Sequence, residues 1–393
     1  MKKKIGLLLA VILVVGAFAG CGQTAESNEA PKAKESKVAA DDTAETKEPE
    51  EPAEETKGEE TKEEELIHIK VASPTFPESF DQIHHYLPIY LGYFEEEGLE
   101  VEIVDGTGKD SKLVQSGEVQ FVGPTAGLVL SGREAGLDLL SVFNECPVNI
   151  FGFAVKNDSE IKEWKDFEGK SIALGDASWQ PLAEPILQAG GIDTSKIEWV
   201  VLGDTRYQGV DRGQADILLT WLGEIGQLLG QGFDFRYFNG DELLPQVSNT
   251  IVTTSTYAKE NPEIVKKYNR ALAKGIYFLY LNPQAAADIV LQSVPSLEID
   301  KEGAIGTSDY CIKTYLGVTQ EEQTDFIENL GIGTLKEESW TSAIKASLDA
   351  GTITKDVVAT DVFTNDYIDN SWDKAEVEED AKNYTFKSKQ FTE

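Results

Sequence analysis

Two segments with the same pattern decide the fold, VQSGEVQFVGPTAG (residues 114–127) and VDRGQADILLTWLG (residues 210–223). At a constant offset of 96 residues, Gly117 falls on Gly213 and apolar positions fall on apolar positions. Each copy combines a helical pattern that ends at a glycine, a short apolar strand and the start of a second helix. Chance similarity over so short a window is the alternative, but the surrounding elements recur in the same order. The repeat therefore predicts two similarly built lobes.

Strand and helix patterns also alternate outside the repeat. IHIKVAS (67–73) has the composition of a strand, and a helical pattern follows over 81–98, in which Pro88 is expected to kink or shorten the helix. Asn-Pro pairs at 261–262 and 282–283 predict two helix starts. The predicted fold class is α/β, with two lobes that each contain a mixed, mostly parallel sheet flanked by helices.

The first 21 residues resemble a bacterial lipoprotein signal peptide. Lys2–Lys4 precede an apolar run over 5–20, which is short for a bilayer span and suits an export signal. Small residues precede Cys21, which is predicted to carry the lipid, such as palmitate. An ordinary secretory signal with an incidental cysteine is the alternative. The anchor predicts a location on the extracytoplasmic face of the cell membrane, with membrane contact through the N-terminal lipid only.

An acidic linker is predicted over residues 22–65. It contains 16 acidic residues, 6 lysines and no aromatic residue, so it cannot bury enough apolar surface to offset its ordering entropy. The whole chain carries −34, residues 1–21 contribute +3 and the linker −10, so the remaining body carries −27. A body this acidic is not expected to bind nucleic acid.

The cysteines and histidines give no pattern for a metal site. Outside the signal, Cys146 and Cys311 are predicted to be free and buried, with a disulfide between them as the alternative. His84 and His85 are adjacent, so on a helix they point about 100° apart and do not readily share one metal ion. We therefore predict no metal and no cofactor.

Ligand contacts are predicted where strands end, because open α/β sheets bind ligands outside the carboxyl ends of their strands. Large aromatic residues in these loops supply stacking surfaces, with a core position as the alternative. Asp176 and Glu224 are expected to accept ligand hydrogen bonds, with helix capping as the alternative. Thr107, Thr125 and Thr205 are expected to donate from their hydroxyl groups to the ligand, again with capping as the alternative. The predicted ligand-binding residues are Ser73, Phe76, Thr107, Thr125, Asp176, Trp179, Thr205, Trp221 and Glu224.

The body resembles the solute-binding proteins of ABC importers, in the group that carries nitrate, sulfonates, taurine and thiamine-type pyrimidines. The resemblance rests on LGYFEEEGLEVEIVDGTG (91–108), GEVQFVGPTAG (117–127), DFEGKSIALGDAS (166–178), GQADILLTW (213–221) and 257–290, with a weaker match at 340–368. It implies a periplasmic-binding-protein-like fold of type II, with crossings near 150–156 and 248–255. It also implies a monomer that docks on a permease with its ATPase. The implied divisions are lobe 1 over 66–152 and 252–393, and lobe 2 over 153–251.

The predicted function is capture of a small molecule between the lobes and its delivery to the permease, without catalysis. Aromatic residues and carboxylates at the cleft favour an aromatic heterocycle, such as a pyrimidine or a vitamin precursor. A sulfonate, taurine or nitrate is the alternative ligand, since helix N-termini suit anions and Arg206 is near a cleft loop. The fold is also compatible with a ligand sensor, or with an enzyme resembling those of pyrimidine synthesis.

Overall fold

The computed structural model describes residues 65–74 and 77–392. The chain divides into Met1–Thr61 and Lys62–Glu393, and every described residue lies in the second unit. The predicted signal peptide with Cys21, the linker before Glu65 and the predicted site residue Phe76 lie outside the described residues. Within the described ranges, no helix combines the length and the apolar character that a membrane span needs.

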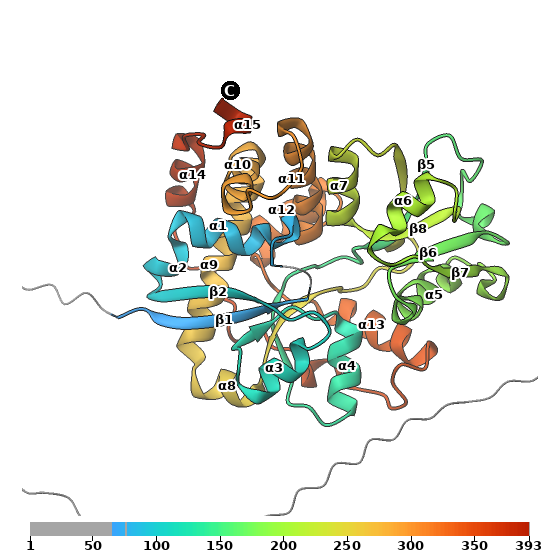
Figure 1. Cartoon of the computed structure of the whole chain (residues 1–393). Helices are drawn as coiled ribbons and strands as arrows, with labels where there is room; N and C mark the ends of the chain where they lie inside the picture. Colours follow the sequence, from blue (N-terminus) through green and yellow to red (C-terminus); the bar gives the residue numbers. More distant parts are fainter. Residues whose placement is uncertain (1–64, 75–76, 393) are drawn as a thin grey trace, which may run out of the picture. The chain divides into compact units, whose positions relative to one another are not determined.

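Two five-stranded sheets with the same arrangement form the centre of this unit (Figure 1). The first sheet has the order β2-β1-β3-β10-β4 and contains β1 (Ile67–Ser73), β2 (Leu99–Asp105), β3 (Phe121–Val122), β4 (Leu140–Asn144) and β10 (Thr250–Thr253). The second has the order β7-β6-β8-β5-β9 and contains β5 (Phe151–Lys156), β6 (Ser171–Leu174), β7 (Glu198–Val201), β8 (Ile217–Trp221) and β9 (Phe235–Asn239). In each sheet the fourth strand runs antiparallel to both neighbours and the first three are parallel. The predicted α/β class with mixed, mostly parallel sheets is confirmed.

The chain crosses between the sheets earlier than the sequence predicts. Residues 145–150 link β4 to β5, and residues 240–249 link β9 to β10. The predicted segments, 150–156 and 248–255, are wrong because they contain β5 and β10 themselves. Their runs of β-branched and aromatic residues are paired within a sheet and do not span the gap between sheets.

The internal repeat is confirmed element by element. Helices α3 (Asp110–Ser116) and α6 (Arg206–Asp211) begin 96 residues apart, and α4 (Ala126–Glu134) and α7 (Leu222–Gly230) begin and end at the same offset. The glycines that close α3 and α6, Gly117 and Gly213, have φ of 78° and 75°, a left-handed conformation that favours glycine.

Helices cover both sheets. The remaining α-helices are α1 (Ile83–Leu91), α2 (Tyr93–Glu96), α5 (Gln180–Ala189), α8 (Ser255–Glu260), α9 (Pro262–Leu281), α10 (Pro283–Ser293), α11 (Lys301–Leu316), α12 (Gln320–Thr324), α13 (Glu337–Asp349), α14 (Lys374–Asn383) and α15 (Lys389–Thr392). Both Asn-Pro predictions are confirmed, since α9 and α10 begin at the prolines. Pro88 does not end the helix, since α1 continues through it to Leu91 and the break comes at Gly92, whose φ is 84°; the kink at Pro88 stays a prediction. The Pro88 ring instead fits against Gly275, where an added Cβ would lie 2.6 Å from its Cδ.

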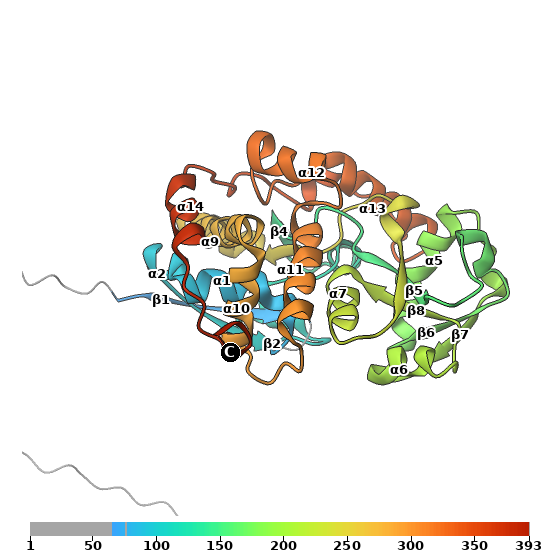
Figure 2. The ribbon, with the colours of Figure 1, turned by 90° about the horizontal axis from the view of Figure 1, so that it is seen from above.

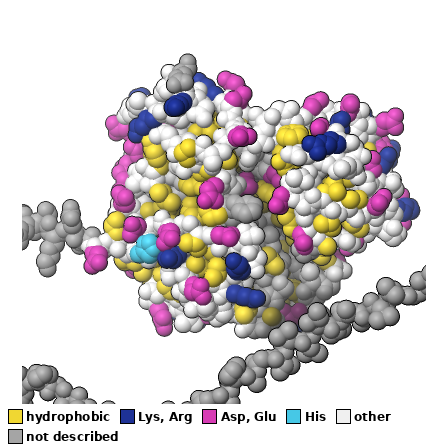
Figure 3. All heavy atoms as spheres, viewed as in Figure 1, with side chains coloured by type: hydrophobic (Ala, Val, Ile, Leu, Met, Phe, Trp, Pro, Cys, Tyr) yellow, Lys and Arg dark blue, Asp and Glu magenta, His cyan; other side chains and the backbone are white. Residues whose placement is uncertain are grey.

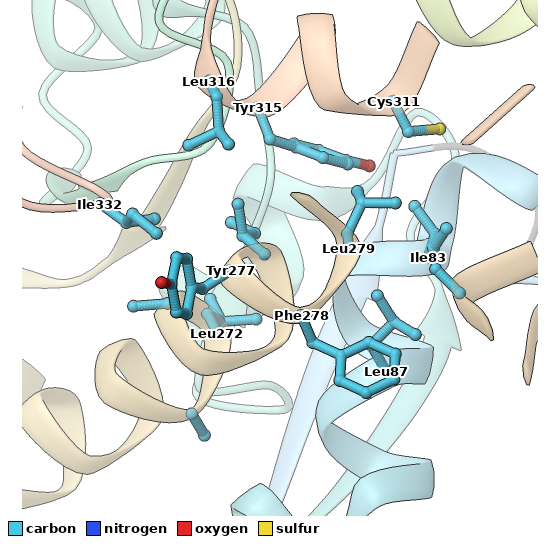
Figure 4. Close-up of a cluster of buried hydrophobic side chains, with 14 of the residues drawn as sticks. Ile83, Leu87, Leu272, Tyr277, Phe278, Leu279, Cys311, Tyr315, Leu316 and Ile332 are labelled. Carbon is cyan, nitrogen blue, oxygen red and sulfur yellow. The ribbon is translucent and has the colours of Figure 1, made fainter. Parts of the chain in front are cut away.

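The largest buried cluster packs α1, α9 and α11 against the first sheet. Figure 4 shows Tyr315 and Cys311 on α11 near Ile83 of α1, with Phe278 of α9 beside Leu87. Cys311 is buried and free, as is Cys146 in the first crossing, which confirms the prediction for both thiols.

Helix α11 also connects this cluster to the second sheet. It lies beside α7 in both ribbon views (Figures 1 and 2). The close approach depends on a pair of glycines, since a Cβ on Gly230 would lie 2.7 Å from the Cα of Gly303. One long helix therefore contacts both halves of the fold beside the crossings.

Candidate ligand-binding site

A cavity of about 240 Å³ lies where segments from both sheets converge with α11. Its floor and walls include the loop after β1, the start of α4, the segment after β4, the start of β5 and the end of β8. Aromatic side chains dominate its apolar surface, namely Phe151, Trp179, Trp221 and Tyr315. A second cavity of similar volume adjoins it and shares Thr125, Leu128, Phe151 and Leu182. We refer to these two cavities together as the cleft.

Trp179 and Trp221 form an edge-to-face pair at the cavity. Their ring centroids are 6.0 Å apart with an interplanar angle of 71°. Trp179 precedes α5, and Trp221 ends β8 and occupies the N-cap position of α7. The pair presents flat aromatic surface to the cavity, and its contact with a ligand stays a prediction.

Arg206 packs against both rings of this pair. Its guanidinium carbon lies 4.6 Å from the centroid of Trp179 and 5.5 Å from that of Trp221. Its Nη2 donates to both carboxylate oxygens of Glu224, at 2.5 and 2.6 Å, and Thr220 Oγ1 donates to the same carboxylate at 2.7 Å. Burial raises the pKa of Glu224, while the charge of Arg206 opposes that rise. Arg206 and Glu224 thus form an ion pair, and neither side chain lines the cavity.

Asp81, in the 3-10 helix η1 (Phe80–Gln82), joins the two halves across the cleft. Its Oδ2 accepts a hydrogen bond of 2.9 Å from Trp221 Nε1. Its Oδ1 lies against the first turn of α7, where a Cβ on Gly223 would overlap it. Burial raises the pKa of Asp81 to about 6, and the bond from Trp221 works in the opposite direction.

Glu145 is the second carboxyl group in the cavity wall. Its side chain is 9% exposed, its Oε1 is 3.6 Å from His84 Nε2, and its Oε2 has no hydrogen-bond partner among the described residues. Burial, with a smaller effect from Asp81, raises the pKa of Glu145 to about 8. His84 Nδ1 lies 2.9 Å from the hydroxyl of Tyr315, which donates to the Asp81 carbonyl at 2.6 Å.

The structure brings together some of the residues predicted from sequence. Thr125, Trp179 and Trp221 line the cavity, and Thr125 also caps α4 through Leu128 N. The other predicted contacts among described residues lie outside that lining, and their ligand role stays a prediction. Ser73 is buried at the end of β1, Glu224 is bonded to Arg206, and Thr107, Asp176 and Thr205 are exposed.

Several residues of this site were missed from sequence, among them Asp81, Glu145, Phe151 and Tyr315. Glu145 follows β4 directly, so the strand-end rule would have selected it had β4 been assigned. Asp81 lies eight residues beyond β1, and Tyr315 comes from a helix late in the chain. No local pattern marks either of these as cavity residues.

The described residues contain no group of three or more His, Cys, Asp or Glu side chains placed to hold a metal ion. His84 and His85 are both buried and each is bonded to a tyrosine hydroxyl. Burial lowers the pKa of His84 to about 3, so its imidazole is neutral.

A family model described as NMT1/THI5 like matches residues 79–286, more than half of the chain. The chain belongs to the NMT1/THI5-like family. The riboflavin-binding protein RibY of Chloroflexus aurantiacus is 24% identical to this family member over 294 residues, which cover 72% of this chain and 81% of that protein. The formylaminopyrimidine-binding protein of Halalkalibacterium halodurans is 26% identical over 215 residues, which cover 52% of this chain and 64% of that protein.

Solved structures confirm the fold of this NMT1/THI5-like chain. The alkanesulfonate-binding protein SsuA from Xanthomonas axonopodis pv. citri, bound to MOPS, aligns with a TM-score of 0.58 at 15% identity, covering 76% of this chain and 99% of that one. The desulfurization enzyme DSZB aligns with a TM-score of 0.50 at 13% identity, covering 77% of this chain and 97% of that one. The fold is thus shared by binding proteins and by an enzyme, and at these identities the likeness shows the fold alone.

Proposed function

We propose that this protein captures a small, uncharged aromatic heterocycle, such as a pyrimidine or a flavin-type vitamin precursor, and delivers it to the permease of an ABC importer. The relatives described as binding riboflavin and formylaminopyrimidine support this ligand class. The single observation that carries the proposal is the cavity wall, which four aromatic side chains share with two carboxyl groups, those of Asp81 and Glu145.

The size of the cavity suits one ring system. Its volume of about 240 Å³ is slightly below the roughly 300–1,000 Å³ usual for drug-sized ligands. Ring stacking on Trp179 or Trp221 contributes about 1–3 kcal/mol per base-like ring. The adjoining cavity, whose lining includes Ser131, Ser248 and Thr352, offers space for a polar substituent.

A sulfonate, taurine or nitrate is the alternative ligand, and the charges at the site argue against it. No lysine or arginine is among the described residues that line the cavity, and Arg206 is already paired with Glu224. An anion there would face two acidic side chains. Figure 3 shows acidic side chains spread across the face of the molecule that it displays, in keeping with the body charge of −27.

Binding without catalysis is proposed because Asp81, Trp221 and Tyr315 are engaged in hydrogen bonds, and burial raises the pKa of the Cys146 thiol, the nucleophile among the described residues that line the cavity. Catalysis is the alternative, because an enzyme shares this fold. Conversion of the bound solute during incubation would support catalysis. A sensor that presents its solute to a receptor is distinguished by whether a permease and an ATPase bind this protein.

Attachment to the membrane is proposed from the sequence pattern alone. Cys21 would carry the lipid, and residues 22–65 would tether the folded unit at the extracytoplasmic face. The division into lobes over 66–152 with 252–393, and 153–251, is also proposed. Sheet membership supports it except at its boundaries, which cut through β5 and β10, so bounds within 145–150 and 240–249 agree better with the two sheets. Metabolic labelling with a palmitate analogue should mark the parent and not Cys21→Ala.

The ligand proposal is tested by mass spectrometry of the solute that co-purifies with the protein, followed by isothermal titration with riboflavin, formylaminopyrimidine and an alkanesulfonate. We expect a ring compound to bind and Trp179→Ala to weaken it by about 1–3 kcal/mol, or roughly 5- to 150-fold in Kd. Trp199→Ala, in a partly buried tryptophan of β7, is the matched control. Binding of the alkanesulfonate alone would refute the heterocycle.

A further inference from the structure

We propose that Glu145 recognises the ligand as a neutral acid: its own proton points to His84, and its Oε2 accepts a hydrogen bond from an N–H group of the ligand. This inference rests on the proposed function, and it specifies the ligand group that the cavity selects. It follows from the directions of the hydrogen bonds behind the cavity, which fix where each proton lies.

The chain of hydrogen bonds begins at the Asp81 carbonyl, which can only accept. The hydroxyl of Tyr315 is 2.6 Å from this carbonyl oxygen, so its single proton is donated there. His84 Nδ1 is 3.1 Å from the same carbonyl and 2.9 Å from the Tyr315 oxygen. Both neighbours face Nδ1 with lone pairs, so Nδ1 must carry the proton of the imidazole.

The protonated Nδ1 leaves His84 Nε2 as an acceptor. Burial keeps the ring neutral, because it lowers the pKa of His84 to about 3. Nε2 has no hydrogen-bond partner among the described residues, and the nearest carboxylate oxygen is Glu145 Oε1, at 3.6 Å. An ionised Glu145 would place a lone pair against a lone pair. A protonated Glu145 resolves the conflict, since its O–H can donate to Nε2 after a shift of a few tenths of an ångström.

The surroundings of Glu145 favour the same protonation state. No cation faces it within the described structure, and the groups that do are acidic, neutral or weakly acidic: Asp81 from η1, His84 from α1, the adjacent Cys146, Tyr268 from α9 and Tyr315 from α11. The side chain is 9% exposed, so water cannot compensate a charge. Burial and Asp81 accordingly raise the pKa of Glu145 to about 8.

One atom then remains for the ligand. Glu145 Oε2 has no partner among the described residues and lies just behind the cavity surface, beside Gly123, so a rotation of the carboxyl group is needed to bring it to the ligand. Leaving such an acceptor unpaired is costly, which favours that rotation when a donor occupies the cavity. A ligand that donates an uncharged N–H, such as a ring imide, a lactam or an amino group on a pyrimidine, satisfies it. A carboxylate or sulfonate presents only acceptors to this atom, and a cationic amine would prefer the ionised acid.

The experiment compares binding of riboflavin, which has a ring imide N–H, with its N3-methyl analogue, and repeats the comparison for 4-amino-5-hydroxymethyl-2-methylpyrimidine and its N,N-dimethylamino analogue. Quenching of the cavity tryptophans reports Kd at pH 7 and pH 9. We expect the parent protein to bind at least one N–H compound at least tenfold more tightly than its methylated partner. Because the fraction of protonated Glu145 falls about tenfold between these pH values when its pKa is about 8, Kd should rise about tenfold at pH 9.

Glu145→Gln replaces the ionisable acid with an amide that stays neutral at both pH values. The amide donates to His84 Nε2 and accepts at its oxygen at both pH values, so Kd of this variant should be the same at pH 7 and pH 9, whereas Kd of the parent rises. Glu198→Gln, at an exposed glutamate of β7, should keep the pH dependence of the parent. Melting curves check that each variant is folded.

The outcomes separate the two proposals. If no compound binds and no ring solute co-purifies, the proposed function fails and this inference fails with it. If a ring compound binds with equal affinity at pH 7 and pH 9, or its methylated analogue binds equally well, only the role of Glu145 is overturned. Tighter binding at pH 9 would show an ionised Glu145 and a cationic ligand, which also overturns it.

Discussion

Replacing Trp221 with phenylalanine tests the hydrogen bond that joins the two halves of the fold. The substitution keeps a smaller aromatic ring at the cavity and removes the indole N–H, which donates to the buried Asp81 carboxylate at 2.9 Å. A hydrogen bond to a charged group contributes about 1.5–3 kcal/mol, against about 0.5–1.5 kcal/mol for a neutral pair. At pH 8, where Asp81 is ionised, Trp221→Phe should therefore lower the free energy of unfolding by about 1.5–3 kcal/mol, in addition to the cost of the smaller ring.

The dependence on pH separates the hydrogen bond from the loss of packing. The pKa of Asp81 is raised to about 6, so the folded protein holds this proton more tightly than the unfolded chain does. The contribution of Asp81 to stability therefore rises as pH falls through about 6, and the bond from Trp221 becomes a weaker, neutral one. At pH 5 the same substitution should cost about 1–2 kcal/mol less than at pH 8. The packing cost is the same at both pH values.

Urea unfolding followed by circular dichroism measures this difference. Trp164→Phe is the matched control, because Trp164 Nε1 donates to the Glu242 carboxylate at 3.4 Å in an exposed position. There the two pH values should agree within about 0.5 kcal/mol, since exposed pairs contribute little. Equal losses for Trp221→Phe at pH 5 and pH 8 would show that the bond across the cleft is absent in the unliganded protein, and the reasoning would be refuted.

Three further tests concern other features of the fold. Gly223→Ala should destabilise the protein by more than about 1 kcal/mol in urea unfolding, because its Cβ would overlap Asp81. Gly127→Ala, at the equivalent position of α4, is the control: its Cβ meets open space, so it should be neutral or stabilising by up to about 1 kcal/mol. Similar effects at both sites would contradict the contact between Gly223 and Asp81. Arg206→Ala should cost about 3–5 kcal/mol because it leaves Glu224 buried without its partner, and a loss below about 1 kcal/mol would argue against the pair. Asp288→Asn should release the C-terminal segment that this carboxylate holds through hydroxyl and backbone donors, measured as faster proteolysis of that segment, and unchanged cleavage would count against the role.

The features that were predicted correctly from sequence are fixed by interactions between residues that are close together along the chain. Gly117 and Gly213 each close a helix in a left-handed conformation, and Asn-Pro pairs start α9 and α10, because a neighbour or two along the chain decides those geometries. The 96-residue offset was visible since both copies repeat the same order of helix, glycine and strand. Trp179 and Trp221 were found because large aromatics at strand ends have few local reasons to be there.

The residues that sequence missed depend on contacts distant along the chain. Pro88 does not shorten α1 because Gly275, nearly two hundred residues later, leaves space for its ring. Arg206 was a candidate to bind an anionic ligand, but in the structure its guanidinium is paired with Glu224. Asp81 and Tyr315 are separated by 234 residues and meet only because α11 packs beside η1.

The sequence by itself determined the two-lobed α/β fold, the helix ends and two of the aromatic residues at the cleft, because periodicity and turn chemistry act over a few residues. The tertiary structure alone decided which charges are paired, which carboxyl groups face the cavity and which protons they hold. Those properties depend on burial and on partners from remote segments, since the ionisation of a side chain responds to everything that surrounds it in space.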